Sequence, residues 1–297
     1  MDMRARIDPL IADRAPWLAA RTPASSIARP VLDRLLGHDQ TVALAETLAP
    51  RPAPVVMEAV ARLVARRIAV TGLANIPATG GALIVANHPT GIADGLVLWR
   101  LLMRRRPDAF FFANADVLRL MPQLDQVIAP VEWRAHRKTR ARTRETMTYA
   151  RQALTRDGRL GVIFPSGRLA QRRGLRLHER PWMTSAAALA RKYDLPVVPV
   201  HLSARNSALY YIFDAIHPSL RDITLFHETL NKASQPYTVT IGAPIPAAGL
   251  SRDPAEATAS LRDATLALGE TPKAPGQPLL AQSSGAARAL FRSLRQT

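Results

Sequence analysis

A histidine and an aspartate share one short polar turn, in the segment Asn87-His88-Pro89-Thr90-Gly91-Ile92-Ala93-Asp94-Gly95. At neutral pH an imidazole can take a proton from an alcohol, and a nearby carboxylate can hold the orientation and tautomer of its ring. The two side chains are therefore a candidate dyad for activating a hydroxyl group. On spacing alone the alternative is structural, with Asp94 capping a helix and His88 satisfying a turn carbonyl.

The flanking segments predict how this turn is positioned. Residues 81–86 form a short apolar run with β-branched members, which predicts a buried strand, and residues 96–103 predict a helix. His88 would then lie just beyond the end of a strand, and Asp94 would open a helix.

A second turn, at residues 164–168, follows the apolar run 160–163. Gly167 has no side chain and would let backbone amides approach an anion, while the guanidinium of Arg168 could grip a phosphate or a carboxylate. A plain surface turn is the alternative. Ser166 lacks the glycines two positions before and after it that a nucleophile elbow requires, because Phe164 and Arg168 stand there.

The strand ending in Asn87-His88-Pro89, with a glycine and then Asp94-Gly95 opening a helix, resembles the first block of the phospholipid/glycerol acyltransferase superfamily. Lysophosphatidate acyltransferases belong to that superfamily. Five residues separate His88 from Asp94, one more than the usual four. This longer form resembles a branch that includes lyso-ornithine-lipid-like and haemolysin-like acyltransferases.

Three further segments resemble the other blocks of that family, and along the chain they stand in the order that the family has. Residues 164–168 resemble its Phe-Pro-Glu-Gly-Thr-Arg block, but Ser166 replaces the glutamate and Arg168 comes one position early. Residues 126–134 resemble the second block, in which the position of Arg134 contacts the phosphate of the acceptor; a solvated arginine at a strand end is the alternative. Residues 195–200 resemble the fourth block, in which Pro199 would shape the pocket, although a proline at a strand edge or bulge is also consistent with the pattern.

The resemblance covers roughly residues 68 to 246, and it implies an α/β fold and an enzyme. The fold would be a glycerolipid acyltransferase-like αβ core with a mixed, largely parallel sheet, and the alternation of strand-like and helix-like runs agrees. The enzyme would move a fatty acyl group from acyl-CoA or acyl carrier protein to the hydroxyl of a lysophospholipid or related glycerol phosphate, in phospholipid biosynthesis or remodelling. His88 would be the general base and Asp94 its orienting partner. Arg134, Ser166, Gly167 and Arg168 would bind the acceptor, with amides near Gly167 stabilising the oxyanion.

The chain is strongly basic, with 40 Lys and Arg against 23 Asp and Glu and a formal charge of +17. Such an excess suits an anionic membrane surface or a nucleic acid. Basic clusters occur at residues 104–106 and 134–144. Aromatic residues make up only 5% of the chain, so the stacking platforms of single-strand binders are not evident and no nucleic acid is expected.

The rival hypothesis is a non-catalytic basic protein that binds anionic membrane or nucleic acid, in which His88 and Asp94 are structural.

The absence of cysteine excludes disulfides, thiolate metal ligands and an acyl-cysteine intermediate. The seven histidines lack the four-residue offset of a zincin helix, so we predict no metal and no cofactor beyond the acyl carrier as co-substrate.

The chain predicts three regions and no internal repeat. Residues 1–67 read as a helical region punctuated by prolines, 68–270 as the acyltransferase domain, and 271–297 as a flexible basic tail. Residues 286–295 could form a short amphipathic helix, and a frayed tail is the alternative. No apolar run is long enough to span a bilayer and no signal peptide is recognised. We therefore expect a cytoplasmic protein, peripheral on the inner face of the membrane.

Overall fold

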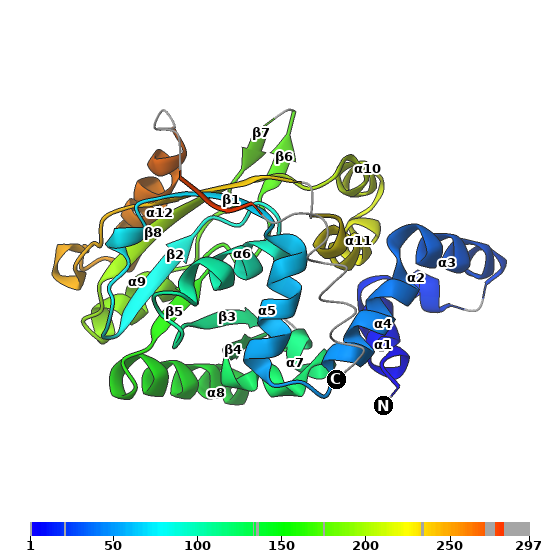
Figure 1. Ribbon diagram of the computed structural model, residues 1–297, viewed down its shortest axis with the longest axis horizontal. Coiled ribbons are helices and arrows are strands. Elements are labelled where there is room, and N and C mark those ends of the chain that lie inside the picture. The colour runs from blue at the N-terminus through cyan, green and yellow to red at the C-terminus, as the bar shows by residue number, and fades with distance from the viewer. Residues whose placement is uncertain are drawn as a thin grey trace.

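The segments predicted as buried strands lie side by side in one sheet. The computed structural model describes residues 2–20, 22–132, 134, 137–174, 176–232, 235–270 and 277–281. Within these residues the sheet has eight strands, in the order β10-β1-β9-β8-β2-β5-β3-β4 (Figure 1). The strands are β1 (Arg67–Thr71), β2 (Ala82–Ala86), β3 (Phe110–Asn114), β4 (Ile128–Val131), β5 (Leu160–Ile163), β8 (Val197–Ser203), β9 (Tyr237–Ile241) and β10 (Gln277–Ala281).

The sheet is mixed and largely parallel, which confirms the predicted α/β core. Neighbouring strands from β8 through β2, β5 and β3 to β4 are all parallel, as are β1 and β9. Only the pairs β8–β9 and β1–β10 are antiparallel among the described strands of this sheet. Parallel strands bring their carboxyl ends to one edge, so the turns that follow β2 and β5 emerge next to each other.

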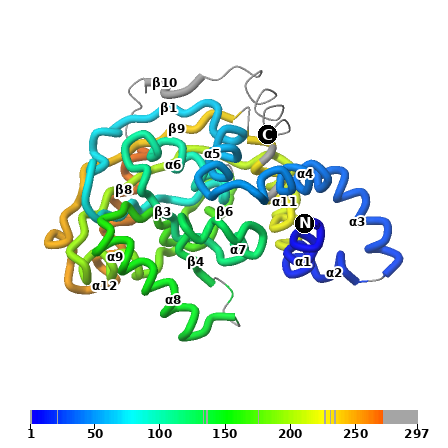
Figure 2. The backbone as a smooth tube through the Cα atoms, turned by 60° about the horizontal axis from the view of Figure 1, so that its bottom comes forward, coloured from blue at the N-terminus to red at the C-terminus, as the bar shows by residue number. Residues whose placement is uncertain are grey.

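Helices cover both faces of the sheet, as Figures 1 and 2 show. They are α1 (Arg4–Arg14), α2 (Pro16–Ala19), α3 (Pro23–Leu36), α4 (His38–Leu48), α5 (Ala53–Val64), α6 (Ile92–Leu102), α7 (Asp116–Leu120), α8 (Arg140–Arg151), α9 (Ser185–Lys192), α10 (Ala208–Ile216), α11 (Pro218–Asn231) and α12 (Pro254–Glu270).

Strand β2 shows why the core has two halves. Its residues are all buried, but alternate side chains point to opposite faces. Ile84 packs in a cluster that includes residues of α5 and α6, whereas Leu83 and Val85 pack with residues of α8, α9 and α12. A strand buried on both faces needs the continuous apolar run that the sequence shows.

The helices before β1 pack on the rest of the chain at two main places, because α5 packs on α6 and α11 contacts α1, α3, α4 and α5. A small cluster of Ala15, Leu18, Leu36 and Ile223 joins α2 and α3 to α11. None of the helices that the structure describes combines the length and the apolarity needed to cross a bilayer. The predicted tail at 271–297, including its amphipathic helix, lies outside the described residues apart from β10.

Candidate active site

The ends of β2 and β5 carry the two turns that the sequence singled out. Val85 pairs with Ile163 in the parallel register, so His88 and the turn at 164–168 leave the sheet at the same level. The backbone then links the two turns, because the Ala170 amide donates to the His88 carbonyl oxygen over 2.8 Å.

His88 and Asp94 are in direct contact. The Nδ1 atom of His88 lies 2.9 Å from Oδ2 of Asp94, whose side chain is fully buried at 0% exposure. The same carboxylate accepts hydrogen bonds from the Thr90 amide (2.8 Å), the Gly91 amide (3.0 Å) and the Thr90 hydroxyl (2.5 Å). Together these donors fix the position of the carboxylate, and the carboxylate fixes the imidazole.

The extra residue between His88 and Asp94 is accommodated by the backbone at Gly91. Its φ of 89° and ψ of −130° lie in a region that essentially only glycine adopts. A Cβ atom there would also lie 3.2 Å from a methyl carbon of Leu169. This bend turns the Thr90 and Gly91 amides toward Asp94 at the start of α6, so the longer spacing still brings the dyad together.

The ring of His88 is oriented for proton transfer. Its side chain is 17% exposed, and the ring stacks on Phe164 with a centroid distance of 4.3 Å and an interplanar angle of 23°. When Nδ1–H donates to Asp94, the lone pair of the imidazole lies on Nε2. Among the described residues Nε2 has no hydrogen-bonding partner, so it can act as the base.

The second turn differs in part from the expectation. Ser166 is 7% exposed and its hydroxyl donates to the carbonyl oxygen of Arg168 over 2.8 Å. Gly167 adopts a positive φ of 59°, but its amide donates to the Phe164 carbonyl oxygen over 2.9 Å, which engages that amide within the turn and away from an oxyanion. Arg168 is exposed to solvent.

Arg134 lies away from the dyad. It follows β4, which is three strands from β2 in the sheet order, or about 14 Å at the usual strand spacing. Its side chain is 6% exposed and pairs with Asp13 at 3.3 Å and Asp116 at 3.1 Å. In this arrangement its guanidinium ties α1 and α7 to the edge of the sheet.

Pro199 is internal to the sheet, although a strand edge or bulge was one expectation. It lies inside β8, between β9 and β2. Gly242 makes room for it, because a Cβ atom there would lie 2.9 Å from Cγ of Pro199.

Sequence reasoning missed Glu179, which directly follows the strand pair β6 (Gln171–Arg173) and β7 (Arg176–His178). Its Oε2 accepts a hydrogen bond from the His88 amide over 3.2 Å, and its Oε1 accepts one from the Trp182 indole N–H over 3.1 Å. Burial raises the pKa of the Glu179 carboxyl, and the hydrogen bonds from the His88 amide and the Trp182 indole oppose that rise. No local pattern marks this residue, because only the tertiary fold brings it to His88.

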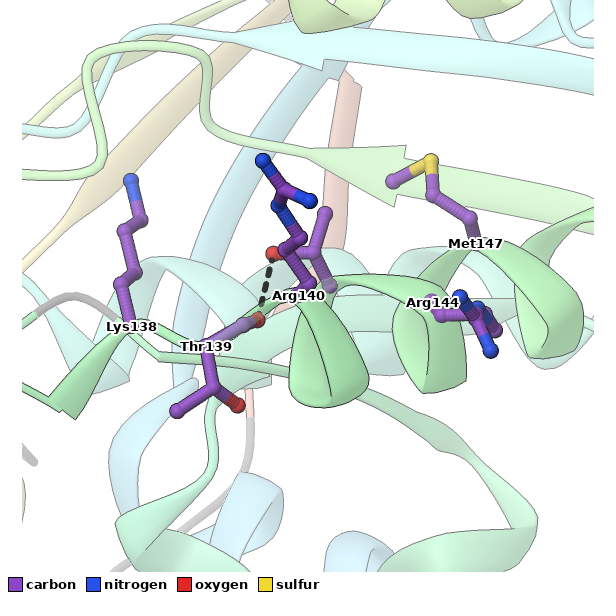
Figure 3. A pocket seen from close by; sticks show the side chains of 6 residues that line it. Lys138, Thr139, Arg140, Arg144 and Met147 are labelled. Atoms are coloured by element: carbon purple, nitrogen blue, oxygen red, sulfur yellow. Dashed lines mark hydrogen bonds between the residues drawn. The ribbon is translucent and has the colours of Figure 1, made fainter.

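The basic cluster after β4 forms a separate surface feature. A hollow of about 470 Å³ is lined by Lys138, Thr139, Arg140, Thr143, Arg144 and Met147 at the start of α8 (Figure 3). Its lining contains neither member of the dyad. Across the residues that the structure describes, no group of three His, Cys, Asp or Glu side chains is arranged to hold a metal ion.

Comparisons with known proteins point to acyltransferases. Residues 67–203 match the family model described as Acyltransferase. A lyso-glycine lipid O-acyltransferase of Phocaeicola vulgatus is 26% identical over 196 residues, covering 64% of this chain and 68% of its own. A protein of the same name from Bacteroides thetaiotaomicron is 24% identical, covering 64% and 70%. The solved 1-acyl-sn-glycerophosphate acyltransferase PlsC of Thermotoga maritima is similar at 16% identity, with a TM-score of 0.48 over 74% of this chain and 81% of that one.

Proposed function

We propose that this chain acts on the hydroxyl of a lysolipid through a His88–Asp94 dyad. The chain is an O-acyltransferase of the phospholipid/glycerol acyltransferase superfamily. The acyl group would come from acyl-CoA or acyl carrier protein. The observation that carries the proposal is the 2.9 Å contact between Nδ1 of His88 and Asp94, which leaves Nε2 as the basic atom.

The chemistry follows from that tautomer. Nε2 of His88 takes the proton from the acceptor hydroxyl as its oxygen attacks the thioester carbonyl carbon. The buried Asp94 carboxylate stabilises the imidazolium that forms. When the tetrahedral intermediate collapses, the carbon–sulfur bond breaks and His88 returns the proton to the departing thiolate.

For the acceptor we propose a lysolipid with an anionic headgroup that Arg168 meets. The relatives named lyso-glycine lipid O-acyltransferases support a carboxylate-bearing headgroup. The ion pairs of Arg134 also support a carboxylate-bearing headgroup, because an acceptor phosphate could bind Arg134 only by replacing Asp13 or Asp116. A guanidinium binds carboxylate and phosphate with the same geometry, so lysophosphatidate is the second candidate.

The test is acyl transfer by the purified protein in the presence of anionic vesicles. Labelled acyl-CoA and acyl carrier protein are each offered with lyso-glycine lipid, lyso-ornithine lipid, lysophosphatidate and glycerol-3-phosphate. We expect transfer to a lysolipid and its loss in His88→Ala, whereas His178→Ala, which changes an exposed histidine of β7, retains it. Transfer that persists in His88→Ala would contradict the dyad mechanism.

A further inference from the structure

We propose that Glu179 is a positioning residue that holds His88 in place and supplies, from beyond the β6–β7 hairpin, the carboxylate that the second turn lacks at Ser166. The inference rests on the proposed function. It explains why the turn that resembles Phe-Pro-Glu-Gly carries a serine.

The Glu179 carboxylate joins the end of β2 to the segment after the β6–β7 hairpin. One oxygen accepts from the His88 amide at the end of β2, and the other accepts from the Trp182 indole beyond the hairpin. The segment that carries Glu179 and Trp182 also lies against the second turn, because the Met183 amide donates to the Pro165 carbonyl oxygen over 2.9 Å. The carboxylate therefore lies beside the position at which the related block has its glutamate.

Electrostatics explains why only one of these two positions carries an acid. A partly buried carboxylate is costly unless donors surround it, and the site offers the amide of His88 and the indole of Trp182. A glutamate at 166 as well would bring two carboxylates close together, and like charges so close resist ionising together. A serine avoids that repulsion, and its hydroxyl donates to the Arg168 carbonyl oxygen within the turn.

The contact clamps the backbone of the proposed base. The His88 amide donates to Glu179, and the His88 carbonyl oxygen accepts from Ala170, so both polar groups of the residue are held. Phe164 and Asp94 hold its ring. Because Glu179 acts through His88, its loss should lower kcat and leave the KM for the acceptor nearly unchanged.

The test compares Glu179→Ala and Glu179→Gln with the double variant Ser166→Glu/Glu179→Ala, which returns a carboxylate from the other position. Glu46→Ala, which removes an exposed glutamate of α4, is the matched control. We expect Glu179→Ala to lower kcat at least tenfold with KM within twofold, Glu179→Gln to fall between, and the double variant to recover most of the loss.

A second readout does not depend on turnover. Hydrogen–deuterium exchange of the peptide that contains His88 should speed up in Glu179→Ala and slow again in the double variant, while melting temperatures show that each variant is folded. Wild-type kcat and exchange in Glu179→Ala would overturn the inference, as would a double variant no better than Glu179→Ala. If exchange of the His88 peptide speeds up in Glu179→Ala but the wild-type protein transfers no acyl group, the inference is supported and the proposed function is rejected.

Discussion

At the scale of residues, His88 has more contacts than a histidine with only a structural role in a turn would need. Asp94 binds its Nδ1 atom, Phe164 stacks on its ring, and Glu179 and Ala170 hold its backbone. A cap on α6 accounts for the contact between Asp94 and the Gly91 amide, but it does not account for an imidazole oriented with Nε2 outward. The rigid placement favours a proton-transfer role, because a base must stay within hydrogen-bonding reach of the hydroxyl.

Asp94→Asn tests the negative charge beside His88. Asparagine would keep its amide oxygen at the Oδ2 position, where the Thr90 and Gly91 amides donate, but it would lack the charge that stabilises the imidazolium. We expect kcat to fall by about 10²- to 10⁴-fold, the usual contribution of general base catalysis. Steady-state transfer assays measure this, with Asp157→Asn, an exposed aspartate, as the matched change; an Asp94→Asn enzyme with wild-type kcat would rule out a role for the charge of Asp94.

Two arginines should behave differently when each is changed to alanine. Arg168 is exposed near the dyad, so its loss should raise the KM for the lysolipid about tenfold, equivalent to about 1.4 kcal/mol, with little change in stability. Loss of Arg134 should lower the melting temperature, because Asp13 and Asp116 would lose a buried cation. Acceptor titrations and thermal melts of both variants separate the roles, and the reverse pattern would show that Arg134 binds the headgroup.

At the scale of elements, short connections determine the site. The bend at Gly91 carries the chain from β2 into α6, and the β6–β7 hairpin returns it to His88 through Glu179. Helix α1 is held to the sheet edge by Asp13, which contacts Arg119 at 2.8 Å and Arg137 at 3.1 Å. Each connection joins segments that a periodicity pattern alone does not bring together.

Gly91→Ala should destabilise the fold and misplace Asp94. The backbone conformation at Gly91 costs a residue with a Cβ about 1–3 kcal/mol, and the new methyl group would press on Leu169. Denaturant unfolding measures the change. Gly95→Ala is the control, because its Cβ would meet only an ordinary contact at 3.9 Å from Phe111 and alanine favours a helix; equal stability of both variants would refute the strain argument.

The Asp13 contacts predict an acid-sensitive stability. Hydrogen bonds from Arg119 and Arg137 lower the pKa of Asp13 from 3.8 to about 2. Because the folded pKa lies below the unfolded one, the stabilisation is complete above about pH 4 and is lost as the pH falls toward about 2. Asp13→Asn should therefore lower the melting temperature near neutrality, and the difference from wild type should shrink on acidification; a difference independent of pH would contradict this origin.

At the scale of the whole molecule, positive charge and exposed apolar side chains meet next to the site. The β6–β7 hairpin presents Arg172, Arg173 and Arg176, and α10 beside it exposes Ile212 and Ile216. Figure 1 shows the hairpin and α10 along the same edge of the molecule, and the Arg172 guanidinium lies 5.2 Å from the ring centre of Tyr211 on α10. This combination suits an anionic lipid surface, which would bring a lysolipid to Arg168.

Charge reversal on the β6–β7 hairpin tests whether this face of the molecule binds an anionic lipid surface. Arg172→Glu should weaken binding to anionic vesicles by about tenfold or more, because each basic residue near such a surface contributes about 1 kcal/mol and an acid is repelled. Vesicle sedimentation at low and high salt measures it, with binding expected to fall as salt rises. Arg252→Glu makes the same charge change at an exposed residue before α12; an equal loss in both variants would indicate a general effect of net charge.

The local sequence was sufficient for the strands, the two turns and the dyad. The apolar runs at 81–86 and 160–163 predicted buried strands, and a histidine and an aspartate in one turn predicted a candidate dyad, whose members lie 2.9 Å apart. These features depend on side-chain periodicity and on backbone geometry within a few residues. Such information is contained in a short stretch of chain.

Only the tertiary structure decided which charges meet. Arg134 seemed free to bind a headgroup, yet the fold places it against Asp13 and Asp116. Ser166 seemed to leave the second turn without an acid, yet the hairpin brings Glu179 to it. The partner of a buried charge is whichever group the fold places within a few ångströms, and sequence separation carries no information about that distance.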